Sequence, residues 1–101
     1  YKNLTESKTF KDKNVLANFI ADLADSFYNE NDFNNALVYY WKIILSVEAR
    51  DFFEYTYFKI INCYLKINDI AKAKYQYNNF KTGFPKSKYL YELNKNGVLT
   101  K

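Results

Sequence analysis

Apolar residues recur at helical spacing along most of the chain. Leu16, Ile20, Leu23 and Phe27 are separated by four, three and four residues, which is the spacing of the apolar stripe of an amphipathic helix. This stripe predicts a first helix from about residue 14 to residues 29–31, closed by asparagine, which tolerates the left-handed conformation. A second stripe predicts a helix that Asp32 N-caps and that faces the core with Phe33, Ala36, Leu37, Tyr40, Ile43, Ile44 and Val47.

Three more helices complete a predicted all-α fold. A short polar link at residues 46–51 leads into a third helix, which we expect Asp51 and Glu54 to open as a capping-box pair. Gly83 is expected to end the fourth helix, and Pro85 suits the first turn of a fifth helix at about residues 86–95, closed by Gly97. The inward residues of the third and fourth helices are Tyr57, Ile60, Ile61 and Tyr64, then Ile70, Ala73, Tyr77 and Phe80.

The chain contains an internal repeat of 37 residues. Matching residues in the segments 27–44 and 64–81 are Phe27 and Tyr64, Asn31-Asp32 and Asn68-Asp69, Ala36 and Ala73, and Tyr40 and Tyr77. A period of this size is typical of stacked helical repeats, in which each unit buries its apolar face against its neighbour. The predicted organisation is a lead segment (1–13), two repeats (14–50 and 51–85), and a capping helix with a tail (86–101). Because about three repeats are usually needed for stability, we expect extra helices, a partner or a dimer.

These residues resemble the tetratricopeptide repeat (TPR) family, whose unit is a helix–turn–helix of about 34 residues. The family's pattern of small and large positions falls in the first unit on Ile20, Leu23, Ala24, Phe27, Asn31, Phe33, Ala36, Tyr40 and Ile43. In the second unit it falls on Tyr57, Ile60, Ile61, Tyr64, Asn68, Ile70, Ala73, Tyr77, Phe80 and Pro85. The resemblance covers about residues 15–88. It implies an α-solenoid fragment of two TPR-like helix pairs with a C-terminal capping helix.

The chain departs from the TPR pattern in three places. Asn31 and Asn68 replace the turn glycine, bulky Ile61 occupies a small position, and the period is 37 residues, with the extra residues placed near 48–51. Arrays with longer periods and a Phe84-Pro85-Lys86-Ser87 tail are similar to those of bacterial envelope proteins, including outer-membrane assembly lipoproteins. This similarity implies a periplasmic or cell-envelope location in preference to a cytoplasmic one.

In the TPR family, the first helices of the units line a concave groove that binds protein segments. The resemblance places eight candidate residues there: Asn18, Asp22, Asp25, Tyr28, Tyr55, Phe58, Lys59 and Asn62. The Lys and Asn that clamp a terminal carboxylate in known grooves are replaced by Ala21 and Asp25, so that clamp is not expected. Aromatic rings with mixed charges suit an extended or helical segment with aromatic anchors. Alternatively, Tyr28 and Phe58 only pack, and the array is a spacer.

A second candidate surface lies on the helix of residues 37–45, which is apolar nearly all round. Beyond its core stripe it carries Val38, Trp41 and Leu45 at spacings of three and four, whereas the equivalent residues of the second unit are Tyr75, Asn78 and Thr82. A helix that is apolar on every side is buried on every side, and Trp is enriched at interaction hot spots. We expect this convex stripe to be covered by a partner, by a second copy, or by sequence of the same chain upstream.

The composition argues against catalysis and cofactors. There is no His, and Cys63 is a lone cysteine, so the chain has neither the commonest general base nor a thiolate–imidazole pair nor a cysteine zinc cluster. No glycine-rich phosphate loop is present. We therefore expect a non-enzyme with no cofactor and no metal.

Charge is divided unevenly along the chain. Residues 1–58 carry six basic and nine acidic side chains, a net charge of −3, and residues 59–101 carry nine basic and two acidic, a net charge of +7. The basic half leaves nucleic-acid or anionic-surface binding as a minor alternative, although a lone arginine, Arg50, gives little capacity for base reading. The favoured prediction is a non-catalytic protein–protein interaction module, a scaffold or adaptor within a larger protein. A structural spacer or a homodimerising domain is the alternative.

Overall fold

The computed structural model describes residues 13–95 and residue 99, and this part of the chain is helical with no strand. Its elements are α2 (Lys13–Asn29), α3 (Phe33–Lys42), a π-helical turn η2 (Ile43–Val47), a 3-10 turn η3 (Arg50–Phe52), α4 (Phe53–Lys66), α5 (Ile70–Gly83) and α6 (Lys88–Asn94). The predicted all-α class is confirmed. The predicted lead segment lies outside the described residues, apart from Lys13.

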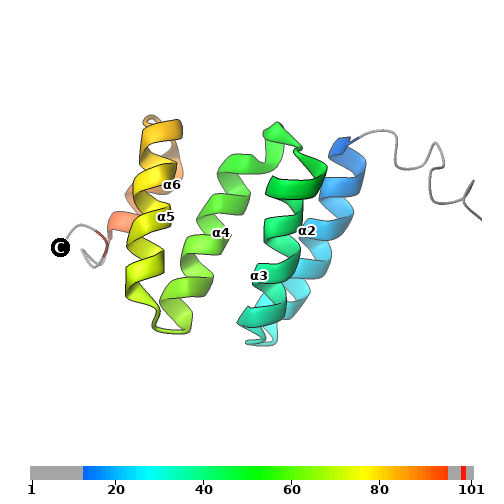
Figure 1. Cartoon of the computed structure of the whole chain (residues 1–101), viewed down its shortest axis with the longest axis horizontal. Helices are drawn as coiled ribbons and strands as arrows, with labels where there is room; N and C mark the ends of the chain where they lie inside the picture. Colours follow the sequence, from blue (N-terminus) through cyan, green and yellow to red (C-terminus); the bar gives the residue numbers. More distant parts are fainter. Residues whose placement is uncertain (1–12, 96–98, 100–101) are drawn as a thin grey trace, which may run out of the picture.

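The helices pack mainly between neighbours in sequence. α2 packs against α3, α3 against α4, and α4 against α5, while α6 folds back against α4 (Figure 1). The tight turns at the foot of α2 and α4 reverse the chain within each pair. α4 is therefore the central element, because it contacts one helix of the first pair, its own partner α5, and α6.

The two tight turns have the same conformation, as the repeat predicts. Asn31 and Asn68 both adopt a left-handed conformation with φ of 64°. The backbone N–H of Asp32 donates to the carbonyl of Phe27 at 2.9 Å, and that of Asp69 to Tyr64 at 2.8 Å. These are the six-to-one hydrogen bonds of a Schellman closure. Each aspartate then N-caps the following helix, which confirms the cap predicted at Asp32 and shows the same cap at Asp69.

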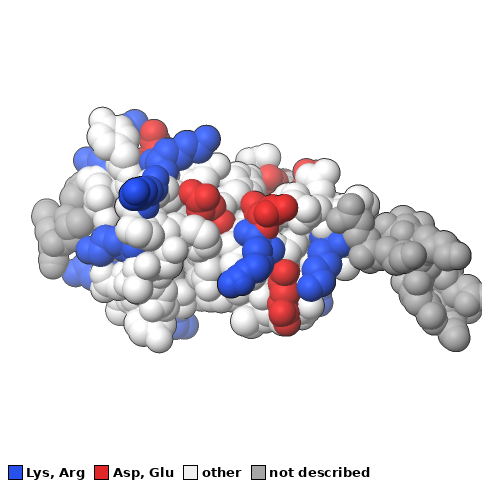
Figure 2. All heavy atoms as spheres, turned by 90° about the horizontal axis from the view of Figure 1, so that it is seen from above, with Lys and Arg blue, Asp and Glu red and all other residues white. Residues whose placement is uncertain are grey.

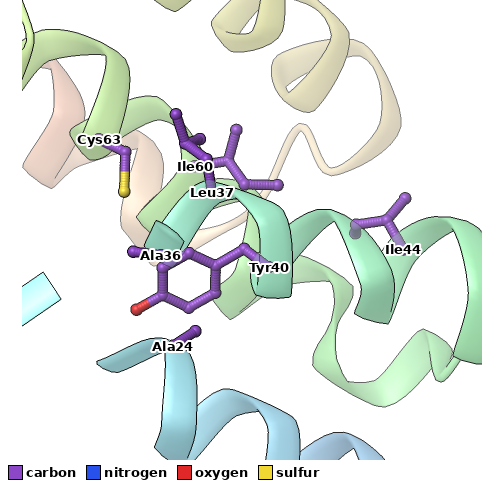
Figure 3. Close-up of a cluster of buried hydrophobic side chains, with 7 residues drawn as sticks. All are labelled: Ala24, Ala36, Leu37, Tyr40, Ile44, Ile60 and Cys63. Carbon is purple, nitrogen blue, oxygen red and sulfur yellow. The ribbon is translucent and has the colours of Figure 1, made fainter. Parts of the chain in front are cut away.

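The core between the pairs is built from small and large side chains that fit together. Ala24, Ala36, Leu37, Tyr40, Ile44, Ile60 and Cys63 form one buried cluster from α2, α3, η2 and α4 (Figure 3). Ala36 and its counterpart Ala73 are both fully buried. A larger side chain at either position would overpack the helix contact.

On α2 the predicted stripe is confirmed except at Leu23, because Ile20 is buried and Leu16 and Phe27 pack against the core. The buried residues of α2 are Ala17, Ile20, Ala21 and Ala24, whereas Leu23 is 36% exposed. The alanines are buried where α2 packs against α3 and η2, so small side chains face the neighbouring helices. The prediction of Leu23 in the apolar stripe therefore mistook a flanking position for the core.

The link between α3 and α4 also differs from the prediction. The last turn of α3 widens into η2, Glu48 takes a left-handed conformation with φ of 55°, and η3 leads into α4. Asp51 does not cap α4; its carboxylate accepts a hydrogen bond from the Asn14 side chain at 3.0 Å. The predicted capping box of Asp51 and Glu54 is therefore wrong. The link is also less polar than predicted, because Val47 and Ala49 are buried against α2.

The last helix is shorter than predicted. α6 begins at Lys88, and Ser87 caps it by accepting a hydrogen bond from the backbone N–H of Tyr89 at 3.2 Å. Pro85 lies in the preceding turn, not in the first helical turn. Leu93 of α6 and Leu99 are buried against α5 and the inner face of α4. The predicted stop at Gly97 falls outside the described residues.

None of the helices in the described ranges is long and apolar enough to cross a bilayer.

Candidate functional site

The candidate site is the face formed by α2 and α4, and its centre is the carboxylate of Asp25. The hydroxyl of Tyr55, on α4, donates to Asp25 Oδ2 at 2.8 Å, and the hydroxyl of Tyr40, on α3, donates to Asp25 Oδ1. Burial first, and then the hydrogen bond to Asp25, raise the pKa of both tyrosines above 10. One carboxylate thus connects three helices and fixes the position of Tyr55 on the face.

Lys59 and Tyr28 form the second contact across this face. The Lys59 ammonium lies 3.5 Å from the centroid of the Tyr28 ring, a cation–π contact between α4 and α2. Burial lowers the pKa of Lys59, and the negative charge of Asp25 opposes that shift. Burial is also the main reason that the pKa of Tyr28 is raised. The two side chains therefore hold each other in a defined orientation while remaining partly accessible.

Cys63 lies beneath the face and is fully buried. Burial raises the pKa of its thiol to about 12, although the nearby Lys59 charge partly opposes this. A thiol with this pKa stays protonated at neutral pH and is a poor nucleophile. Its place in the core agrees with a packing role, and the described residues contain no group of three or more His, Cys, Asp or Glu side chains placed to hold a metal.

At the far side of the face, α6 covers part of α4. The rings of Phe58 and Tyr89 stack with centroids 4.5 Å apart, and Tyr89 also contacts Tyr55 edge-on at 6.4 Å. Phe58 therefore packs against the capping helix. The structure brings Asp25, Tyr28, Tyr55 and Lys59 together across α2 and α4, whereas the ring of Phe58 is covered by Tyr89 of α6.

The remaining groove candidates are polar and lie at the surface. Asn18 and Asp22 are exposed on α2, and Asn62 is half-buried on α4, on the same side as Tyr55 and Lys59. Within the described part of the chain, no hydrogen-bond partner is recorded for the Asn62 amide. Ala21, by contrast, is buried against Ile43 and Val47 and does not line the face.

The three residues of the convex stripe on α3 and η2 lie in different environments. Val38 is 53% exposed and Leu45 is 69% exposed. Trp41 lies half-buried between α3 and α4, where its indole N–H donates to the Tyr64 hydroxyl at 3.3 Å and its ring meets Tyr57 edge-on. Trp41 thus has partners within the molecule, and Val38 and Leu45 remain at the surface.

Sequence reasoning missed the roles of Tyr40 and Tyr89 at this site. Tyr40 was assigned to the core, and it is fully buried, but its hydroxyl orients the central carboxylate. Tyr89 lies on a helix whose packing direction the sequence does not specify. The available signal was Asp25 itself, a carboxylate among the small residues of a core-facing helix, which needs hydrogen-bond donors if it is partly buried.

Comparisons with protein-family models, with curated proteins and with solved structures give no match for this chain.

Proposed function

We propose that this chain is a TPR-like protein–protein interaction module, a scaffold or adaptor domain of a larger protein, and that the face of α2 and α4 binds a segment of its partner. The 37-residue repeat, the identical Asn-Asp turns and the neighbour-to-neighbour packing of the helices support the repeat assignment. The Phe84-Pro85-Lys86-Ser87 tail favours a bacterial envelope protein as the parent.

The observation that carries this proposal is the preorganised row of side chains on the face. Asp25 fixes Tyr55, and Lys59 is held over Tyr28, so these groups lose little conformational freedom when a ligand binds. Next to them, the Asn62 amide can donate to and accept from the backbone of an extended peptide. A fixed aromatic and charged row with an adjacent amide suits recognition of a peptide backbone with an aromatic or acidic side chain.

The test begins with peptides selected from a random display library on the immobilised domain. We expect selected peptides to bind the wild type saturably in fluorescence anisotropy. Asn62→Ala should weaken binding about fivefold, because a hydrogen bond contributes about 0.5–1.5 kcal/mol. Lys59→Gln should weaken binding of acidic peptides by at least as much.

Two matched variants control for general effects. Asn34→Ala removes an exposed amide from α3, and Lys66→Gln removes an exposed charge from the end of α4. Both should bind selected peptides as the wild type does. The proposal fails if the library gives no binding peptides, or if every selected peptide binds Asn62→Ala and Lys59→Gln as tightly as it binds the wild type.

A second candidate function is self-association through Val38 and Leu45, and the exposure of these two apolar side chains, about two turns apart on α3 and η2, favours it. Leu45→Ser is a better probe than a Trp41 variant, because Trp41 also packs inside the molecule. If this function holds, light scattering after size exclusion should give a dimer for the wild type and a folded monomer for Leu45→Ser. A wild-type monomer at both low and high protein concentration would exclude it.

A further inference from the structure

The side of α4 opposite the candidate face contains a hollow of about 340 Å³. It is lined by Arg50, Phe53, Tyr57, Asn79, Gly83 and Phe84. Phe53 and Tyr57 are four residues apart and so share one side of α4, about half a turn away from Tyr55, Lys59 and Asn62. The volume is close to the lower end of the range for small-ligand sites, about 300 Å³. The hollow is therefore separate from the face that carries the proposed function.

The aromatic rings on one wall of the hollow are held in place by contacts with neighbouring rings. Phe53 and Tyr57 meet edge-to-face with centroids 6.3 Å apart, and Trp41 contacts Tyr57 edge-on at 6.1 Å. On the other wall, Phe84 lies against the buried ring of Phe80 at 5.6 Å. Rings that are held in this way present fixed edges and faces to a further ring, and aromatic pairs of this geometry attract each other beyond their burial.

Gly83 lines the hollow at the end of α5. It is the last residue of α5, where glycine is a poorer helix former than alanine. Its backbone is not in the left-handed region, and a Cβ added there would have no neighbouring atom within 4 Å. Neither backbone conformation nor packing thus requires glycine at this position. Gly83 is one of the residues that line the hollow, and without a side chain it occupies little space there.

Arg50 gives the hollow a positive rim. Its guanidinium lies 6.0 Å from the centroid of the Phe53 ring, and no ion pair is recorded for it among the residues that the structure describes. A guanidinium presents paired N–H groups that match a carboxylate. The exposed Asn79 amide adds a donor and an acceptor on the opposite wall.

The charges around the hollow are mixed, so its attraction for a carboxylate comes from Arg50. Lys74 and Lys81 lie about half a turn of α5 away from Asn79 and Gly83, with Lys81 near the Tyr77 ring, and Lys72 pairs with Asp69 at the start of α5. Figure 2 shows basic side chains over the α5–α6 end of the molecule and acidic side chains next to basic ones over its middle. Glu54 lies in an adjoining hollow of about 280 Å³, beyond Phe84 and together with Lys86.

From these observations we propose that the hollow is a second docking site, which takes one aromatic side chain of an acidic segment of another protein. The aromatic ring packs against Phe53, Tyr57 and Phe84 above Gly83, and a neighbouring carboxylate pairs with Arg50. The apolar lining provides the anchor, and the Arg50 guanidinium selects a segment that carries a carboxylate.

The test uses the acetylated pentapeptide DEWED, titrated into 15N-labelled protein. We expect the largest shifts at the Gly83 amide, the Asn79 side chain and the Phe84 amide. Gly83→Leu fills the hollow and should weaken binding at least about tenfold, whereas Thr82→Leu, which adds the same side chain one residue earlier, should not. Arg50→Gln should weaken binding about fivefold and reduce its salt dependence, whereas Lys66→Gln should not.

Further peptides separate the two parts of the proposal. DEAED, which lacks the ring, and KKWKK, which lacks the acids, should both bind at least about tenfold more weakly than DEWED. Equal binding of DEAED, KKWKK or the proline peptide DEPED would overturn the proposal, and so would unchanged binding to Gly83→Leu. Shifts confined to Tyr28, Lys59 and Asn62 would overturn it too, and would assign the acidic peptide to the α2–α4 face. Circular dichroism of Gly83→Leu and Gly83→Ala checks that both fold.

Discussion

Tyr40 and Tyr77 occupy the same place in two helix pairs, 37 residues apart, yet their hydroxyls have different partners. Tyr40 donates to Asp25 in the helix before it, whereas Tyr77 donates to Asn94, in the helix that follows its pair, at 2.7 Å. The residue that corresponds to Asp25 in the second pair is Asn62, which Tyr77 does not contact. The repeat thus preserves the donor and changes the acceptor.

This difference has a consequence for binding. In the first pair the acceptor is the Asp25 carboxylate, which accepts hydrogen bonds from two tyrosine hydroxyls and so stabilises the fold. In the second pair the equivalent amide is left without a recorded partner among the described residues, so it remains able to bind a ligand. One repeat position therefore stabilises the fold in one unit and is free to act in recognition in the other.

The largest expected effect comes from replacing each of the two residues, Asp25 and Asn62, with alanine. Asp25→Ala leaves the buried Tyr40 hydroxyl and the Tyr55 hydroxyl without their acceptor and should lower the free energy of unfolding by about 3 kcal/mol. Asn62→Ala should change it by less than about 0.5 kcal/mol. Urea unfolding of both variants measures this contrast. Equal losses would mean that the two positions have the same structural role.

Removing each tyrosine hydroxyl should give a smaller contrast. Tyr40→Phe removes a hydrogen bond to a charged group and should cost about 2 kcal/mol, whereas Tyr77→Phe removes a bond to an exposed amide and should cost about 1 kcal/mol. Thermal unfolding followed by circular dichroism gives the order. A larger loss for Tyr77→Phe would contradict the assigned partners.

Alkaline pH should destabilise the first helix pair through the hydrogen bonds that Tyr40 and Tyr55 make to Asp25. The folded-state pKa of Tyr40 and Tyr55 lies above the unfolded value of 10.0, mainly because of burial. Their contribution is complete below pH 10 and is lost as the pH rises above 10, since the unfolded chain then releases protons that the folded chain retains. The free energy of unfolding should therefore fall between pH 9 and pH 11, and less steeply in Tyr40→Phe. An equal slope in both proteins would contradict this linkage.

Thr56 allows a further comparison of residues that are 37 positions apart. The residues 37 positions before and after it are the apolar Phe19 and Leu93, but Thr56 is fully buried, and its hydroxyl has no partner in the described part of the molecule. Thr56→Val keeps the shape and removes this hydroxyl, so it should stabilise the protein by about 1 kcal/mol. A destabilised variant would show that the hydroxyl has a partner.

The smallest effects should come from the turns, where the two pairs are alike. Asn31→Gly and Asn68→Gly each relieve a left-handed asparagine and should stabilise the protein by less than about 1 kcal/mol, by equal amounts. Melting temperatures of the two variants provide the measurement. Unequal gains would mean that the two turns are under different constraints.

The features that the sequence predicted correctly are those encoded locally. The Asn-Asp turns, their caps and the ends of α2 and α5 follow from residue types whose backbone preferences act over a few positions. The all-α class follows from the spacing of apolar residues. These predictions needed no knowledge of how the helices meet.

The features that the sequence did not predict depend on contacts between distant segments. η2 widens where Val47 and Ala49 turn inward against α2, and Asp51 binds Asn14, 37 residues away, in place of capping α4. Tyr89 stacks on Phe58 because α6 folds back onto α4. Periodicity assigns a side chain to a helix face, but it does not specify which neighbour will cover that face.

The central claim is that the α2–α4 face binds a protein segment, and its most direct test is to map a library-selected peptide onto 15N-labelled wild-type protein by chemical-shift perturbation. The account predicts that the largest shifts occur at the Asn62 side-chain amide and at the backbone of Tyr28 and Lys59, and that Asn62→Ala raises the Kd of the same peptide about fivefold. Shifts centred on Val38 and Leu45, or spread over the surface without saturation, would contradict it.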